Sequence, residues 1–165
     1  LRARRGPVAV HILGPETAIS TTVEQQLRDL VGPEMVDRVA GDTPAATAVA
    51  FAEYQRGDFG WGLTGAGHGF AFVSLERWQD GVVAALTAHL GGHGPLLLAA
   101  RDNLPPETRG YLERVRPTFP EHDPTQARLN RGYLVAVRDT VGYDQQAKID
   151  WLLEAVPTMD GYLSP

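Results

Sequence analysis

The sequence contains no cysteine, which excludes disulfide-stabilised scaffolds, thiolate zinc sites and cysteine nucleophiles. Lysine occurs once, at Lys148, and no cluster of basic residues follows the first five positions. With 15 basic against 20 acidic residues and a formal net charge of -5, a surface that neutralises nucleic-acid phosphates or anionic lipids is not expected. No apolar run approaches the ~20 residues that span a membrane. We therefore expect neither nucleic acid as a partner nor membrane insertion.

The composition is that of an ordinary globular domain. The 165 residues are 43% apolar and 21% charged, which suits one domain with its own core. Arg4 and Arg5 precede the apolar stretch 8–13, but this stretch is too short for a secretory signal and leads into polar residues. We expect no signal peptide in the given chain, a single α/β module over residues 1–157, and a C-terminal tail over 158–165.

Apolar runs and turn residues predict five strands that alternate with five helices. The predicted strands cover residues 8–13, 36–40, 70–74, 96–100 and 133–137. The predicted helices cover residues 21–31, 44–54, 80–90, 105–115 and 144–156. Such alternation favours a doubly wound, mainly parallel five-stranded sheet with helices on both faces. Strand order does not follow from the sequence.

Local signals place the ends of these elements. Thr21 and Glu24 have the spacing of a capping box, and Thr43 precedes a proline at the first helical position. Asp80 is expected to cap the third helix. Residues 56–69 are rich in glycine and predict a loop, while the prolines in 117–131 predict an extended connection.

Candidate catalytic residues are few. Ser74 ends a predicted strand, where a nucleophile could sit, but it lacks the G-x-S-x-G elbow. Asp102 and Asp139 follow strands and could form a metal-dependent phosphotransfer site, although helix N-termini attract aspartate for capping alone. We favour capping. The chain is therefore expected to be no enzyme.

Metal and phosphate sites are equally weak. His89 and His93 have helical metal-ligand spacing, but Gly91 and Gly92 interrupt the helix between them. The segment 65–69 (GAGHG) precedes a strand rather than following one, so a flexible loop is favoured over a dinucleotide fingerprint. We predict no metal and no cofactor.

Three aromatic residues leave a choice open. Tyr54, Trp61 and Trp78 lie outside or at the edges of the predicted elements. Exposed aromatic rings stack on sugars, and half-buried rings also complete cores.

The first and last strand–helix units echo one another. Residues 8–27 (VAVHILGPETAISTTVEQQL) and 132–152 (GYLVAVRDTVGYDQQAKIDWL) share a strand, a turn, a helix and a Gln-Gln pair. Chance similarity and a true repeat both remain open on this pattern alone.

Several segments together resemble the type 2 cell-wall-binding repeat family. In chain order they are 38–42 (RVAGD), 47–50 (TAVA), 74–80 (SLERWQD), 94–98 (GPLLL), 103–105 (NLP) and 111–112 (YL). Residues 12–27 (ILGPETAISTTVEQQL) are similar to the phrase that closes each repeat of that family. The resemblance covers most of residues 8–116, and a diverged closing phrase recurs at 132–153.

The resemblance implies a Toprim-like or flavodoxin-like fold. It divides the chain into a closing unit of a preceding repeat (8–31) and one complete repeat (36–156), with insertions at 56–69 and 117–131. It further implies anchoring to an anionic wall polymer by modules packed in threes, and a location outside the cell, at the wall or surface. The residues that match its binding segments are Leu96, Leu97, Leu98, Ser74, Trp78, Asp80 and Thr47.

The chain also departs from the family pattern. Pro44 and Ala45 replace an Arg-Tyr pair, Leu75 replaces a glycine, and Arg138-Asp139 replaces the second Gly-Gly. We therefore expect a non-enzymatic cell-envelope module that binds wall glycan or assembles a surface protein, with wall polysaccharide or other copies as partners. The alternatives are an oligomerisation scaffold that has lost glycan binding, and a hydrolase or phosphotransfer enzyme.

Overall fold

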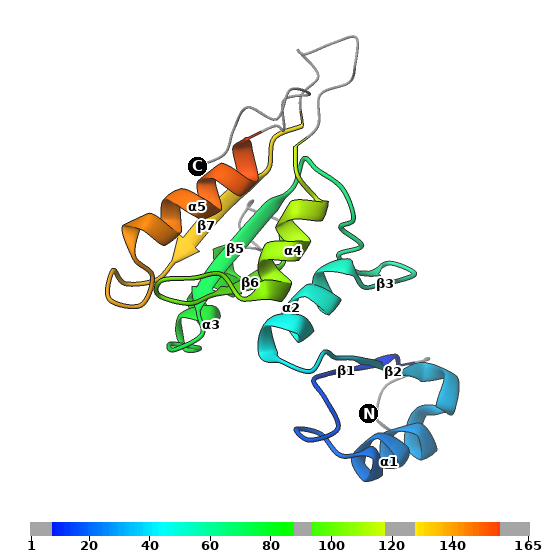
Figure 1. The fold of residues 1–165 in the computed structure, drawn as a ribbon. Helices are drawn as coiled ribbons and strands as arrows, with labels where there is room; N and C mark the ends of the chain where they lie inside the picture. The colour runs from blue at the N-terminus through cyan, green and yellow to red at the C-terminus, as the bar shows by residue number, and fades with distance from the viewer. Residues whose placement is uncertain (1–7, 88–93, 118–127, 156–165) are drawn as a thin grey trace.

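The computed structural model describes residues 8–87, 94–117 and 128–155 (Figure 1). Its strands are β1 (Val10–Leu13), β2 (Val36–Val39), β3 (Gln55–Arg56), β4 (Phe59–Gly60), β5 (Gly69–Ser74), β6 (Leu96–Ala99) and β7 (Arg131–Val135). Its α-helices are α1 (Thr21–Val31), α2 (Pro44–Glu53), α3 (Asp80–Thr87), α4 (Pro106–Arg114) and α5 (Tyr143–Glu154), and a 3₁₀ turn, η1, covers Pro33–Met35.

The α/β class and the order of the elements agree with the sequence analysis. All five expected strands and all five expected helices occur, with ends that differ by a few residues. The expected end of the third helix at residue 90, most of the extended connection, and the tail over 158–165 lie outside the described residues.

A single five-stranded doubly wound sheet is not confirmed. The described strands form a parallel pair β1-β2, an antiparallel hairpin β3-β4, and a parallel three-stranded sheet in the order β6-β5-β7. In Figure 1, β1, β2 and α1 lie below the larger sheet, and α2 connects the two parts. Helix α2 packs against β6 and α4, and β2 pairs with β1 without extending the larger sheet. The hairpin corrects the first part of the loop expected over 56–69, while residues 61–68 form no strand or helix, as expected.

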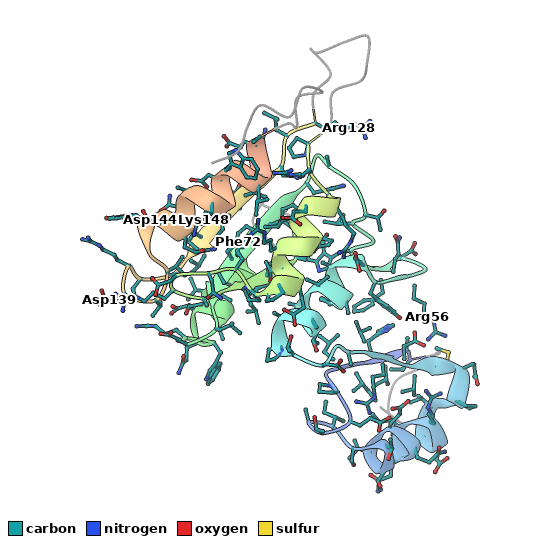
Figure 2. The ribbon with its side chains drawn as sticks, in the orientation of Figure 1. Arg56, Phe72, Arg128, Asp139, Asp144 and Lys148 are labelled. Atoms are coloured by element: carbon teal, nitrogen blue, oxygen red, sulfur yellow. The ribbon has the colours of Figure 1, made fainter. Side chains whose placement is uncertain are left out.

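Helices cover both faces of the three-stranded sheet. On one face, Phe72 of β5 and Leu97 of β6 are fully buried against α2, α4 and α5, and Figure 2 labels Phe72 at this interface. On the other face, Ala71 and Val73 pack against Ala84 of α3. Alternate residues of each strand thus feed two separate apolar layers, as the period of two requires. No helix among the described residues has the length and apolar character needed to cross a bilayer.

The helix caps are partly as expected. Thr43 caps α2, since its Oγ1 accepts a hydrogen bond from the backbone N–H of Ala46 at 3.0 Å. The prediction that Thr21 and Glu24 form a capping box is wrong. Ser20 is the N-cap residue of α1, and its Oγ accepts a hydrogen bond from the backbone N–H of Val23 at 3.4 Å. Glu24 is instead held by arginines, as described below.

Candidate functional site

The residues that match the family's binding segments divide between the two faces of the sheet. Leu96 and Leu98 of β6 pack in the layer under α3, while Leu97 points into the opposite layer. Leu97 and Ser74 are both 0% exposed. The Ser74 Oγ accepts a hydrogen bond from the backbone N–H of Glu76 at 3.1 Å. A ligand cannot touch either side chain in this structure, and a role of these residues in binding stays a prediction.

Trp78 and Asp80 lie at the start of α3, near Leu96. Trp78 is 71% exposed and is the accessible large side chain of the set. Asp80 is the first residue of α3, and its Oδ2 lies 3.2 Å from the Arg77 Nε. A Cβ on Gly81 would lie 3.6 Å from the Leu96 Cδ1, which places this end of α3 over β6.

Exposed apolar side chains are frequent in the segment 75–86. These residues, which we call the α3 surface, are Leu75, Trp78, Val82, Val83 and Leu86, with 40–71% of each residue exposed. Helix α3 buries Ala84 against the sheet and leaves Val82, Val83 and Leu86 exposed, while Leu75 and Trp78 lie in the turn before it. Exposed apolar patches larger than usual commonly mark contact sites for partners or ligands.

Thr47 has a local structural role. Its Oγ1 accepts a hydrogen bond from the N–H of Gly41 at 3.1 Å and donates to the carbonyl of Gly41 at 3.3 Å. A Cβ on Gly41 would lie 2.3 Å from the Ala46 Cβ. The residues 41 and 47 therefore shape the turn between β2 and α2, and Thr47 lies apart from the α3 surface.

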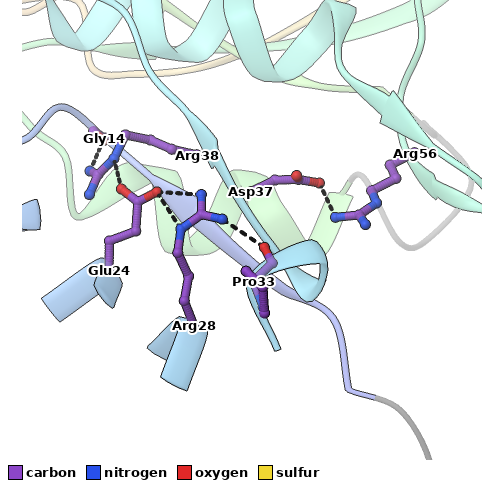
Figure 3. A network of polar contacts seen from close by, with 7 residues as sticks. All are labelled: Gly14, Glu24, Arg28, Pro33, Asp37, Arg38 and Arg56. Atoms are coloured by element: carbon purple, nitrogen blue, oxygen red, sulfur yellow. Dashed lines mark hydrogen bonds and ion pairs between the residues drawn. The ribbon is translucent and has the colours of Figure 1, made fainter. Parts of the chain in front are cut away.

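An ion-pair network joins the two segments that resemble the closing and opening phrases of a repeat (Figure 3). The Glu24 carboxylate of α1 accepts from Arg28 at 2.6 Å and from Arg38 of β2 at 2.8 Å. Arg38 also donates to the carbonyl of Gly14 at 2.8 Å, and Arg28 donates to that of Pro33 at 2.6 Å. The two arginines hold the pKa of Glu24 below its ordinary value. The network fixes α1 on the β1-β2 pair.

A second polar cluster ties the β1-β2 pair to α2 and the hairpin. Asp37 of β2 accepts from the Tyr54 hydroxyl at 2.6 Å and from Arg56. His11 of β1 lies 3.0 Å from that hydroxyl and stacks on Phe59 at 4.0 Å between ring centroids. The hydrogen bond from Tyr54 and the guanidinium of Arg56 lower the pKa of Asp37. Burial and the neighbouring Asp37 raise the pKa of Tyr54.

Sequence reasoning missed both clusters. A cavity of about 350 Å³ adjoins them and is lined by Arg28, Arg38 and Arg56. All three guanidinium groups donate to carboxylates or carbonyls of the chain, so their chemistry here is structural. The partners Asp37 and Arg56 are 19 residues apart and belong to no local motif, which is why the pattern of the chain did not reveal them.

The Asp37 cluster predicts an acid-dependent loss of stability. Since the folded-state pKa of Asp37 lies below its ordinary 3.8, its stabilising effect is complete above that pH and disappears as the pH falls through the lowered value. Urea unfolding of Asp37→Asn should therefore show lower stability than wild type at pH 5–7, with the difference shrinking below about pH 4. Asp58→Asn, at an exposed hairpin residue, is the matched control and should change little. A constant difference across the whole pH range would contradict the cluster.

The remaining candidate catalytic and metal-binding residues are Asp102, Asp139, His89 and His93. Within residues 8–87, 94–117 and 128–155, no group of three or more His, Asp or Glu side chains could hold a metal ion. The Asp102 side chain is 85% exposed beside Arg101, and Figure 2 shows Asp139 in the turn before α5. His89 and His93 lie outside the described residues.

The comparisons with known proteins reveal a similar fold. No protein-family model matches the sequence, and no curated protein matches it. Among solved structures, the chain is similar to Cwp8 from Clostridium difficile, with a TM-score of 0.60 and 18% sequence identity. The match covers 88% of this chain and 22% of Cwp8, so the chain corresponds to a small part of that protein. At this identity the likeness concerns the fold.

Proposed function

We propose that this chain is a non-enzymatic module of the cell envelope that binds wall glycan or holds a surface protein in its assembly. The observation that carries the proposal is the shared fold with Cwp8, a cell wall protein, over 88% of the chain. The segments that resemble a cell-wall-binding repeat occur in the same order as in that family, which also favours a role in the cell envelope. On this proposal the protein acts outside the cell, at the wall or surface.

The α3 surface supports a place for glycan contact. The indole of Trp78 is 71% exposed, and aromatic rings of this kind stack on the apolar faces of sugars. Asp80 lies at the same end of α3, where its carboxylate pairs with Arg77 and its side chain is 18% exposed. Leu97 and Ser74, which are buried, would contribute by holding the strands beneath this surface.

The environment of Ser74 supports a non-enzymatic role. Its hydroxyl is buried and bonded to the N–H of Glu76. A serine nucleophile needs access to substrate and a base within hydrogen-bond reach. Among the described residues, no histidine makes a hydrogen bond to Ser74.

The same surface favours a second candidate, an oligomerisation scaffold. The α3 surface is apolar, and Val82 and Leu86 remain 65% and 63% exposed. Burial of such side chains against another copy or module is favourable by roughly 25 cal/mol per Å². The contact would be apolar and therefore insensitive to salt.

One pair of measurements separates the two candidates. In sedimentation with protein-free cell walls of the source organism, wild type should pellet, and Trp78→Ala should bind about 5- to 10-fold more weakly through the loss of one ring contact. Tyr143→Ala, which removes a 66% exposed ring on α5, is the control and should pellet like wild type. Equal binding of Trp78→Ala and wild type would show that the α3 surface is not the site of glycan contact.

Light scattering at micromolar concentration provides the second readout. If the chain is an oligomerisation scaffold, the wild type should have a mass above the 17.9 kDa of one chain. The substitution Val82→Asp should then lower the mass to that of the monomer. A monomeric wild type that still pellets with walls supports glycan binding. A monomer that does not pellet contradicts both candidates.

A further inference from the structure

Two exposed arginines, Arg128 and Arg131, have no side-chain partner within the described part of the chain. Every other described arginine pairs with a carboxylate or lies over an aromatic ring. The paired ones are Arg28, Arg38, Arg56, Arg77, Arg101, Arg109 and Arg114, and those over rings are Arg116 and Arg138. In a chain of net charge -5, acidic partners are in excess. The charges of the two unpaired arginines are therefore available to a ligand.

Both arginines line one polar cavity of about 570 Å³. Its other walls are residues 66–68, which precede β5, together with Leu129, Asn130 and Glu154, the last residue of α5. Arg131 is the first residue of β7, so the cavity lies where β5 and β7 begin. Figure 2 shows Arg128 at this end of the sheet and Asp139, which follows β7, at the other. Since the α3 surface follows the end of β5, the two places are separate.

Asn130 fixes the walls of this cavity. The residue is 1% exposed, and its Oδ1 accepts hydrogen bonds from the backbone N–H groups of Gly67 at 2.9 Å and His68 at 3.1 Å. Its Nδ2 donates to the carbonyl of Val115 at 2.7 Å. A buried amide with these partners holds the loop before β5 against the segment that carries the two arginines. The backbone of the cavity is thus ordered before a ligand arrives, which lowers the entropic cost of binding.

Gly67 leaves room for the stem of Arg128. Its φ of +96° lies in the region that favours glycine. A Cβ at this position would lie 3.2 Å from the Arg128 Cβ and 3.5 Å from its Cδ. The aliphatic stem of Arg128 therefore packs directly over Gly67, which gives the glycine-rich segment 65–69 a role in placing this side chain at the cavity.

The charges on the walls favour an anion with several oxygens. Guanidinium groups donate paired hydrogen bonds to phosphate and carboxylate oxygens. Two of them, set against the one carboxylate of Glu154, favour a doubly charged phosphate ester over a single carboxylate. The cavity is larger than a phosphate group alone, and the Glu154 carboxylate can accept hydrogen bonds from hydroxyl groups on the rest of the ligand.

We propose that this cavity binds the phosphate group of a phosphorylated sugar or polyol. Arg128 and Arg131 donate to the phosphate oxygens, and Glu154 accepts from the hydroxyl groups. A free phosphate monoester and a phosphodiester within a polymer share this chemistry. The proposal goes beyond the proposed function and does not depend on it.

Isothermal titration of the full chain in phosphate-free buffer tests the chemistry with three probes. Glucose 1-phosphate should bind saturably, while glucose, which lacks the phosphate, should bind at least about tenfold more weakly. Glycerophosphoglycerol distinguishes the sources: binding at least as tight as that of glucose 1-phosphate assigns the site to phosphodiesters, and weaker binding assigns it to monoesters. The proposal is overturned if neither ester binds saturably, or if glucose binds as well as its phosphate.

Matched variants locate the site. Arg128→Gln and Arg131→Gln should each weaken binding of the tighter ester at least about fivefold. Both positions are exposed, so the melting temperature should change little. Arg109→Gln is the control, since it removes the same charge from an exposed arginine that pairs with Glu113 on α4, and it should bind like wild type.

Glu154→Gln should have the opposite effect on the charge and tighten binding of inorganic phosphate about twofold or more, because it removes a negative charge beside the anion. Equal losses in all three arginine variants would show a general effect of net charge and refute the site. Unchanged affinity in both Arg128→Gln and Arg131→Gln would refute it as well. Wall sedimentation through Trp78 is independent of these results.

Discussion

Replacing Leu97 by alanine should lower the free energy of unfolding by about 2–5 kcal/mol, among the largest effects expected of any single change in this chain. Leu97 is 0% exposed in β6 and packs with Phe72 of β5 and the helices of one face. The substitution removes this apolar contact and leaves a cavity that the close-packed layer fills only in part.

Urea unfolding followed by circular dichroism measures this effect. Leu86→Ala makes the same chemical change at a side chain that is 63% exposed, and it should cost less than about 0.5 kcal/mol. A loss below about 1 kcal/mol for Leu97→Ala would show that the strand is not part of the central core.

This result bears on how the proposed function is tested. Because Leu97 and Ser74 are buried, their substitution alters the sheet before it alters any contact with a ligand. A loss of wall binding in Leu97→Ala would therefore reflect unfolding. Trp78, which is exposed, reports on contact itself. The resemblance to the repeat family grouped these residues together, and the structure separates the buried ones, which build the fold, from Trp78, which is exposed.

The elements of the fold were predictable because their causes are local. Apolar periodicity located β5 and β6, and Thr43 followed by a proline marked the start of α2. Each of these signals lies within a few residues of the structure it determines. The end of α1 at Gly32 followed from the same kind of signal.

The arrangement of the strands was not predictable because it depends on distant contacts. The pairing of β2 with β1 alone, apart from β6-β5-β7, is set by contacts between distant segments, which no local pattern encodes. The pairs Glu24–Arg38 and Asp37–Arg56 likewise join residues far apart in the chain. The burial of Gln145 was missed for a similar reason, since a Gln-Gln pair at the start of a helix is typical of an exposed position. Only the packing of α4 and α5 shows that one of the two is buried.

Gly94→Ala should be at least as damaging as Leu97→Ala, with an expected cost of about 3 kcal/mol or more. A Cβ at Gly94 would lie 1.8 Å from the carbonyl oxygen of Gly69 and 2.4 Å from its carbonyl carbon. These atoms belong to the backbone at the start of β5, so no side-chain rotation can relieve the overlap. The strands themselves must move apart, which places the cost at or beyond the ~1–3 kcal/mol of ordinary overpacking.

Gly65→Ala is the matched control for this substitution. A Cβ at Gly65 would meet no heavy atom within 4 Å, so alanine should be neutral or should stabilise the chain by up to about 1 kcal/mol through a less flexible unfolded state. Urea midpoints of the two variants should therefore move apart, with Gly94→Ala well below wild type and Gly65→Ala at or above it. Coinciding midpoints would show that β5 and β6 do not approach as closely as the parallel register of Ala71 with Leu96 requires. The glycine of the GPLLL segment would then need another explanation, because its steric role depends on that close approach of the two strands.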